Sequence, residues 1–184
     1  MQTRVADGFT LIEVLVAILL LAVGILGASA VQLMVLRTRH ASALMSGGVQ
    51  LAGTLADRMR ANSAAMQAGD AANPYLQFRY DAASDGAPAP ASVMCFGAAA
   101  CNSAQLAAFD LYETKHALFS DFPHGRLAVC RDATVVSGAG ALAWACAPAA
   151  NAPVVIKVGW RDRRDAPGTP FGPSVALVVT GAFP

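Results

Sequence analysis

The chain has 184 residues, which is enough for one domain with a modest hydrophobic core. Charged residues make up 14% of it and hydrophobic residues 55%, whereas a soluble domain usually carries about a quarter of charged residues. The net charge of +1 provides no overall field that would attract nucleic acid, and we expect no nucleic acid partner.

The first predicted element is an apolar helix. No residue is charged from Val14 to Leu36, and at about 1.5 Å per residue this run would be roughly 35 Å long. That length crosses the hydrocarbon core of a bilayer. A core helix of a soluble protein is rarely apolar on every face for so long. We therefore expect a membrane-spanning segment.

Two interpretations of this segment compete. In the first it is a secretory signal peptide that is cut after Ala30, in the small-x-small sequence Ala28-Ser29-Ala30. Such a cut would release a secreted binding or enzymatic domain into the periplasm. In the second, cleavage precedes the apolar run and the helix stays in the mature protein.

The sequence Gly8-Phe9-Thr10-Leu11-Ile12-Glu13 favours the second interpretation. It resembles the processing motif of type IV prepilins and of type II secretion pseudopilins. The resemblance implies that prepilin peptidase cuts after Gly8 and methylates the new amino terminus of Phe9. It also implies that Glu13 acts in assembly. The charges of Arg4 and Asp7 oppose each other, so charge does not predict a cytoplasmic location for residues 1–8. That location is implied by the resemblance.

The position of Glu13 supports the resemblance on physical grounds. A carboxylate costs up to about 2.5–3.5 kcal/mol at the centre of a bilayer, and less near its surface. A signal peptide has no use for this charge. In a fibre, the amine of Phe9 on one subunit can pair with Glu13 on its neighbour. The simpler alternative is that Glu13 marks the membrane boundary.

The helical pattern continues beyond the membrane segment. Leu44, Leu51, Leu55 and Met59 fall near one helix face, and no proline occurs before Pro74. The pattern predicts one helix from Phe9 to Asn62, whose second half is amphipathic. Glycines within it weaken the helix, and we expect them to permit close packing, with local unwinding during assembly as the alternative. They are Gly24, Gly27, Gly47, Gly48 and Gly53.

Residues 62–91 are rich in Ala, Asp, Asn, Gly and Pro, which predicts a surface connection with a short extended piece. Ser103 is predicted to cap a helix that runs to Phe119. Its buried side would comprise Leu106, Phe109, Tyr112 and Leu118. Four β-like runs follow and suggest an antiparallel meander. They are Arg126–Val136, Ala141–Cys146, Val154–Arg161 and Ser174–Thr180.

The chain has four cysteines, and with a targeting segment an even count predicts disulfides. If residues 137–139 form a hairpin loop, Val136 faces Gly140 and Cys130 faces Cys146. Cys95 then pairs with Cys101. The other two connectivities stay open. The spacing does not fit a zinc site, and we expect no metal and no cofactor.

No catalytic signature is present, and His40, His116 and His124 are isolated, so we expect no enzyme. The run Arg161–Asp165 alternates in sign, which is typical of a solvated loop. An adhesive tip subunit that binds a surface through Arg161–Pro173 is a further alternative.

The resemblance can be narrowed. The run Phe9–Gln32, the segment Leu55–Asn62 and the stretch Cys101–Asp132 together resemble a minor pilin of the PilV type. This implies an α+β, type IV pilin-like fold, in which the long N-terminal helix packs on a small disulfide-bonded antiparallel sheet. The implied parts are a leader (1–8), a transmembrane and assembly half-helix (9–36), an amphipathic half-helix (37–62) and a globular periplasmic head (63–184).

The resemblance also implies a function and a location. The chain would be a single-pass inner-membrane protein with its head in the periplasm, and later part of a pilus at the cell surface. Its partners would be prepilin peptidase and other minor and major pilins. A pseudopilin of a type II secretion system is the alternative within the same class.

Overall fold

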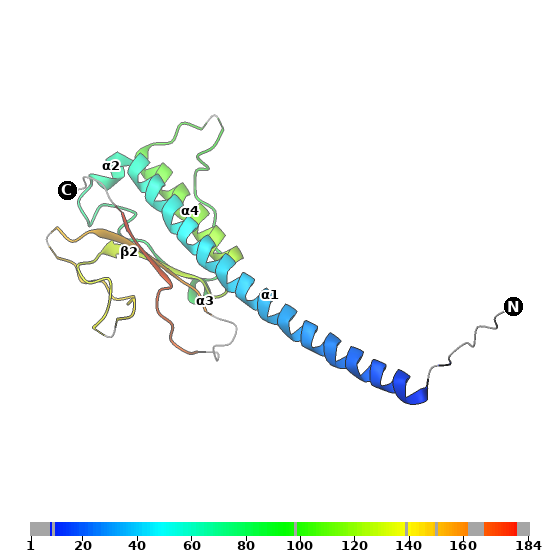
Figure 1. Ribbon diagram of the computed structural model, residues 1–184. Coiled ribbons are helices and arrows are strands. Elements are labelled where there is room, and N and C mark those ends of the chain that lie inside the picture. Colours follow the sequence, from blue (N-terminus) through cyan, green and yellow to red (C-terminus); the bar gives the residue numbers. More distant parts are fainter. Residues whose placement is uncertain are drawn as a thin grey trace. The chain divides into compact units, whose positions relative to one another are not determined.

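The structure is a computed structural model that describes residues 8, 10–97, 99–138, 140–149, 151–161 and 168–179 (Figure 1). The chain divides into two compact units, Met1–Ala43 and Leu44–Pro184, called the N-terminal and C-terminal units below. The helices are α1 (Leu11–Ala61), α2 (Ser63–Met66), α3 (Ala82–Asp85) and α4 (Ser103–Asp121). The strands are β1 (Arg79–Asp81), β2 (Arg126–Arg131), β3 (Val154–Gly159) and β4 (Val175–Val179).

These elements confirm the predicted fold class. A long apolar N-terminal helix is combined with a small antiparallel sheet and two disulfides. Helix α1 matches the predicted helix within one or two residues at its ends, although Phe9 lies outside the described residues. The four strands pair in the order β1-β2-β3-β4, each antiparallel to the next.

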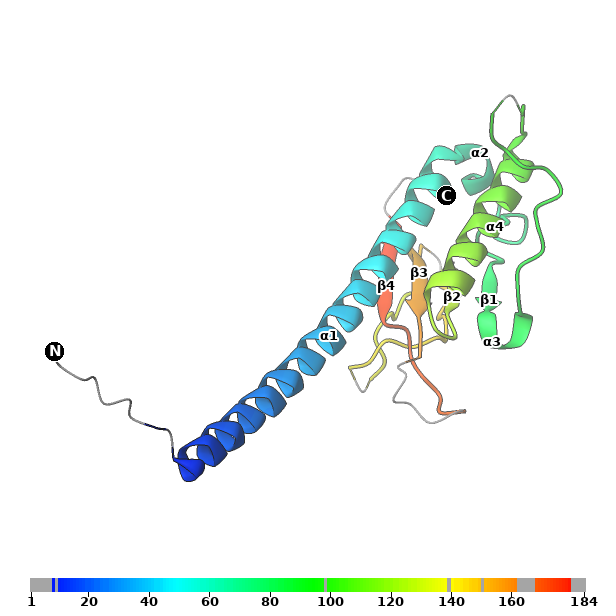
Figure 2. The same ribbon diagram turned by 90° about the vertical axis from the view of Figure 1, so that its right-hand side faces the viewer.

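The C-terminal unit is layered. The last turns of α1 and the whole of α4 lie side by side in both views and cover one face of the sheet (Figures 1 and 2). Leu55 and Met59 of α1 are fully buried there, as their spacing predicted, and Leu44 and Leu51 are half-buried. The strands contribute alternate residues to this core, including Leu127, Val129, Ile156 and Val158.

The opposite face of the sheet is also covered. Every residue of β3 is buried, including Val155 and Lys157, which point away from the helices. The cover is the connection between β2 and β3, drawn in yellow in Figure 1 on the side of the sheet remote from the helices. Because both faces are covered, β3 is a near-continuous apolar run rather than an alternating one.

The ion pair of Asp132 and Lys157 fastens this connection to the sheet. Their side chains are both fully buried, and Nζ of Lys157 lies 2.6 Å from Oδ2 of Asp132. Nζ also donates to the carbonyl oxygens of Ala143 and Ala145, at 2.7 and 2.6 Å. Oδ1 of Asp132 accepts from the backbone N–H groups of Thr134 and Ala147, each at 3.0 Å. A buried charge pair is tolerated when its remaining donors and acceptors are satisfied in this way.

The prediction of a strand at Ala141–Cys146 was wrong. Strand β2 ends at Arg131 and pairs with β3, and the described part of the connection holds only an isolated bridge between Val136 and Leu142. This bridge is shifted from the predicted pairing of Val136 with Gly140. Nζ of Lys157 donates to the carbonyl oxygens of Ala143 and Ala145, which in a strand would accept from the backbone of a neighbouring strand.

The cysteines pair as predicted, but not for the predicted reason. Cys130 is bonded to Cys146 and Cys95 to Cys101, with Cα atoms 6.3 and 5.8 Å apart. Cys130 lies opposite Val155 of β3, not opposite Cys146 in a hairpin. Its side chain leaves the outer face of the sheet and meets Cys146 in the covering connection. The disulfide therefore joins the cover to β2, as Lys157 joins it to β3.

The segment 62–91 is more ordered than predicted. It contains α2, β1 and α3, and the predicted short extended piece corresponds to β1 at Arg79–Asp81. Tyr75, Phe78 and Tyr80 lie in the core rather than on the surface. The hydroxyl of Tyr75 donates to Oδ2 of Asp110 at 2.7 Å, so burial and this carboxylate raise the pKa of the phenol far above its usual value.

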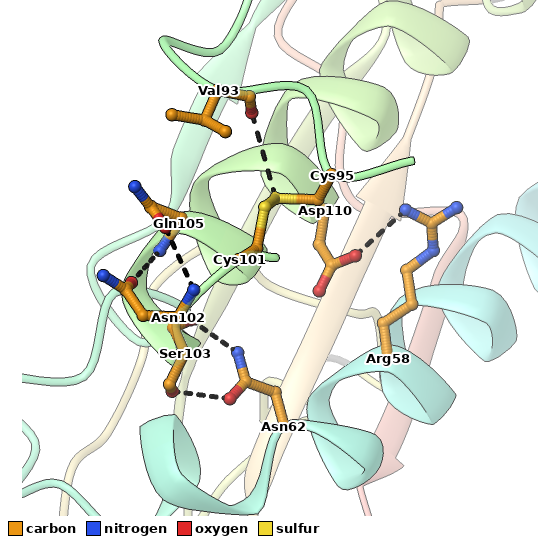
Figure 3. The surroundings of a disulfide bond; sticks show 9 residues. All are labelled: Arg58, Asn62, Val93, Cys95, Cys101, Asn102, Ser103, Gln105 and Asp110. Atoms are coloured by element: carbon orange, nitrogen blue, oxygen red, sulfur yellow. Dashed lines mark hydrogen bonds and ion pairs between the residues drawn. A yellow bond between two sulfur atoms is a disulfide. The ribbon is translucent and has the colours of Figure 1, made fainter. Parts of the chain in front are cut away.

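Helix α4 begins with a cap that differs from the prediction. Asn102, not Ser103, is the N-cap: its side chain accepts from the backbone N–H of Gln105, whose side chain accepts from the N–H of Asn102 (Figure 3). Of the predicted buried side, Phe109 and Leu118 are buried, whereas Leu106 and Tyr112 are half-buried.

Ser103 instead contributes to the join between α1 and α4. Its hydroxyl donates to Oδ1 of Asn62 at 2.6 Å, and Nδ2 of Asn62 donates to the carbonyl of Ser103 at 2.8 Å (Figure 3). One turn earlier in α1, Nη1 of Arg58 lies 3.1 Å from Oδ1 of Asp110 and 2.5 Å from Glu113. These contacts hold the end of α1 against α4, inside the C-terminal unit.

Two glycines of α1 permit close packing, as predicted. A Cβ atom on Gly48 would lie 2.5 Å from the indole of Trp160, and one on Gly47 would lie 3.4 Å from Phe122. A Cβ on any of the other three helix glycines, Gly24, Gly27 and Gly53, would meet no heavy atom of the described residues within 4 Å outside the adjoining helix backbone. Among the described residues, packing therefore accounts for Gly47 and Gly48 only.

The contrast between Gly48 and Gly53 is testable. We expect Gly48→Ala to destabilise the protein by about 1–3 kcal/mol, because the methyl group would displace Trp160. Gly53→Ala, in the same helix, has open space and should stabilise it by up to about 1 kcal/mol through helix propensity. Chemical denaturation of the detergent-solubilised chain, followed by tryptophan fluorescence, measures both. Equal effects of the two substitutions would contradict the packing account.

Candidate assembly site

The described part of the N-terminal motif begins a helix. The carbonyl oxygen of Thr10 accepts from the backbone N–H groups of Glu13 and Val14, at 3.1 and 3.3 Å. Glu13 is thus in the first turn of α1, where a negative charge is favourable beside the free N–H groups of a helix terminus. This effect of the helix terminus favours an acidic residue at position 13, but it does not make one necessary at the start of an apolar segment.

The apolar part of α1 is not covered by any other part of the chain that the structure describes. Every described residue from Thr10 to Ala43 is exposed. An 18-residue window of α1 reaches a mean hydropathy of 2.8 with none of it buried, so the helix is long and apolar enough to cross a membrane. Each fully exposed Val, Leu or Ile forgoes about 1.5–3 kcal/mol of burial free energy. The segment therefore requires a lipid or protein environment.

The polar side chains of this segment are suited to such an environment. The hydroxyl of Ser29 donates to the carbonyl oxygen of Ile25 at 2.8 Å, and that of Thr38 donates to Met34 at 3.0 Å. Both hydroxyl donors are thereby satisfied inside the helix, without water. The helix also continues unbroken through Ala28-Ser29-Ala30, the alternative cleavage sequence.

Comparison with protein families identifies this N-terminal segment. Residues 4–29 match the family model described as the prokaryotic N-terminal methylation motif. The chain has a prepilin-type N-terminus. This motif is of the kind found in type IV pilins and pseudopilins, and it implies processing by prepilin peptidase and assembly with other pilins. No curated protein and no solved structure matches the chain.

The predicted site residues are placed as follows. Gly8 is exposed just before the helix, and Glu13 is exposed in its first turn. Phe9, the predicted cleavage and methylation residue, lies outside the described residues, as does most of the predicted leader. The four cysteines are in the C-terminal unit, where both disulfides serve its fold.

The described residues contain no cluster of metal ligands. No group of three or more His, Cys, Asp or Glu side chains that could hold a metal ion occurs among them. Sequence reasoning missed the buried pair of Asp132 and Lys157. A lysine between Ile156 and Val158 in a strand suggests a solvated side chain, and only the cover over β3 shows otherwise.

Proposed function

We propose that this protein is a minor pilin of the PilV type, which takes part in starting or assembling a type IV pilus. Prepilin peptidase removes residues 1–8 after Gly8 and methylates Phe9. Residues 9–36 then anchor the subunit in the inner membrane, with the amphipathic half-helix 37–62 and the head at 63–184 in the periplasm. From there the subunit enters the fibre through its N-terminal helix.

The observation that carries the proposal is the methylation motif at the start of an uncovered apolar helix. An anchor alone would explain the apolar helix, but it would not require Glu13 in its first turn. In a fibre, the helices of neighbouring subunits cover one another, and the carboxylate of Glu13 meets the amine of a neighbour's Phe9. The disulfide-bonded C-terminal unit suits an oxidising compartment such as the periplasm.

The mature N-terminus tests the cleavage site. We expect the chain purified from membranes to begin with methylated Phe9, because the proposal has prepilin peptidase cut after Gly8, within the matched motif at residues 4–29. Intact-mass measurement and N-terminal sequencing provide the result. A chain that begins at Val31 would mean release by signal peptidase and would refute the proposal.

A pseudopilin of a type II secretion system is the second candidate, because the motif occurs in both kinds of protein. Deleting the gene distinguishes a minor pilin from a pseudopilin. We expect surface fibres to decrease at least tenfold while secretion of folded proteins stays unchanged. The reverse pattern would assign the chain to secretion. Complementation with the intact chain is the control.

A further inference from the structure

Two arginines and two aromatic residues form a cluster at one end of the sheet. The guanidinium carbon of Arg126 lies 4.5 Å from the ring centre of Trp144, and that of Arg161 lies 5.7 Å from the ring centre of Phe171. The two rings meet edge to face, with their centres 6.1 Å apart. We call these four residues the Arg–aromatic cluster. It joins parts of the chain that the sequence separates widely.

The cluster is held in place by the fold. Gly159 of β3 makes room for Trp144, since a Cβ there would lie 2.9 Å from its ring. Nε1 of Trp144 donates to the carbonyl oxygen of Phe171 at 2.6 Å. Nη2 of Arg161 donates to the carbonyl of Thr169 at 3.2 Å. Side chains that are already ordered lose little conformational entropy when they bind a ligand.

Neither arginine forms a strong ion pair among the described residues. The one ion pair of Arg126 there is with Asp81, whose Oδ2 lies 3.9 Å from Nε, and both side chains are about one-third exposed or more. Such a pair is weak. Nε of Arg161 has no hydrogen-bond partner among the described residues, but it is buried, so an anion would meet only the exposed part of this half-buried side chain. Planar guanidinium groups suit phosphate oxygens.

The rings favour a membrane surface over nucleic acid. Each ring already has a guanidinium over one face, and both aromatic side chains are half-buried, which leaves little open surface for stacking a base. Tryptophan is enriched at the membrane–water interface, where an arginine beside it can keep its charged head among the headgroups.

The cluster is near the point where the chain enters the C-terminal unit. Trp160, next to Arg161, packs on Gly48, and Arg126 lies opposite Gly159 at the same end of the sheet. Only residues 37–46 separate the apolar run from this region. Even fully extended, they would span no more than about 40 Å. A tether of this length keeps the cluster close to any membrane that holds the apolar helix, and so raises its effective concentration there.

We propose that the Arg–aromatic cluster docks the C-terminal unit onto anionic phospholipid headgroups while the subunit waits in the membrane. The proposal rests on the proposed function in one respect: the apolar half of α1 must be embedded. Arg126 and Arg161 bind headgroup phosphates, and Trp144 and Phe171 enter the interfacial layer. Each arginine near an anionic surface favours the docked state by roughly fivefold.

The experiment uses the full chain in lipid nanodiscs. Discs of phosphatidylcholine are compared with discs that also contain phosphatidylglycerol, each with a spin label on a lipid headgroup. Quenching of tryptophan fluorescence measures docking, with label-free discs as the reference. We expect at least twofold stronger quenching in anionic discs. The excess should vanish in 1 M salt, where the screening length falls to about 3 Å.

Three double variants test the residues. Arg126→Gln with Arg161→Gln should abolish the excess quenching, whereas Arg126→Lys with Arg161→Lys should retain most of it. Arg60→Gln with Arg131→Gln removes the same charge elsewhere in the C-terminal unit and should change nothing. Equal quenching in both kinds of disc, or an excess that survives the Arg126→Gln and Arg161→Gln changes, would overturn the proposal.

The design separates this proposal from the function on which it rests. Co-elution of the chain with the discs reports whether the apolar helix is embedded. Failure to co-elute would count against the membrane-anchored pilin itself. Co-elution without lipid-dependent quenching would overturn the docking alone and leave the proposed function standing.

Discussion

Replacing Glu13 with alanine is expected to leave cleavage and membrane insertion intact and to lower the amount of subunit in fibres at least tenfold. In the fibre the amine of the neighbouring Phe9 would lose its partner inside an apolar bundle. Stranding one member of a buried ion pair costs about 3–5 kcal/mol, and each 1.4 kcal/mol is a factor of ten in an equilibrium. Quantitative immunoblots of membranes and of sheared fibres measure the two quantities.

Two controls make this result specific. Glu13→Asp keeps the charge and should retain part of the incorporation. Asp57→Asn removes a carboxylate from an exposed position on the same helix, where it pairs with Arg60, and should have no effect on fibres. Normal incorporation of Glu13→Ala would refute charge pairing and leave Glu13 as a boundary marker.

Replacing Lys157 with methionine is expected to destabilise the C-terminal unit by about 3–5 kcal/mol, a large part of the 5–15 kcal/mol typical of a domain. The change would leave the fully buried carboxylate of Asp132 without its counter-ion, and the carbonyls of Ala143 and Ala145 without a donor. Although burial opposes ionisation, the hydrogen bonds from Lys157 and from two backbone N–H groups hold the pKa of Asp132 below its usual value. The carboxylate is therefore charged at neutral pH.

Denaturant unfolding of the detergent-solubilised chain, followed by the fluorescence of its tryptophans, measures the loss. Lys157→Met combined with Asp132→Asn should recover part of it, since the amide oxygen can still accept from Thr134 and Ala147. An Asp57→Asn variant, at an exposed ion pair, should change stability by less than about 1 kcal/mol. A single Lys157→Met variant as stable as the parent would show that the pair does not hold the cover in place.

The parts of the fold that were predictable depend on local or repeated signals. The first half of helix α1 could be predicted from its uncharged apolar run, and the second half from the spacing of Leu55 and Met59. The N-terminal motif could be recognised because its residues are contiguous. Strands β3 and β4 were found because short runs of valine and isoleucine are seldom anything else. These signals are present in the chain before any tertiary contact is made.

The parts that were missed depend on distant partners. A short extended piece was expected within residues 62–91, but the position of strand β1 at Arg79–Asp81 depends on its pairing with β2. Residues 141–146 resemble a strand, yet their backbone is held by Lys157. The Arg–aromatic cluster was invisible for the same reason. No aromatic residue interrupts the charges after Arg161, and Phe171 and Trp144 reach the two arginines only through the fold.

The way in which the cover is fastened to the sheet has a consequence for how the protein can change over evolutionary time. Lys157 donates to the backbone carbonyl groups of Ala143 and Ala145, and Asp132 accepts from the backbone N–H groups of Thr134 and Ala147. These backbone groups are present whatever the side chain. Apart from Cys146 and Trp144, the outward-facing residues of this connection can therefore be substituted without loss of these contacts. Variation at these positions would then leave the scaffold of the C-terminal unit unchanged.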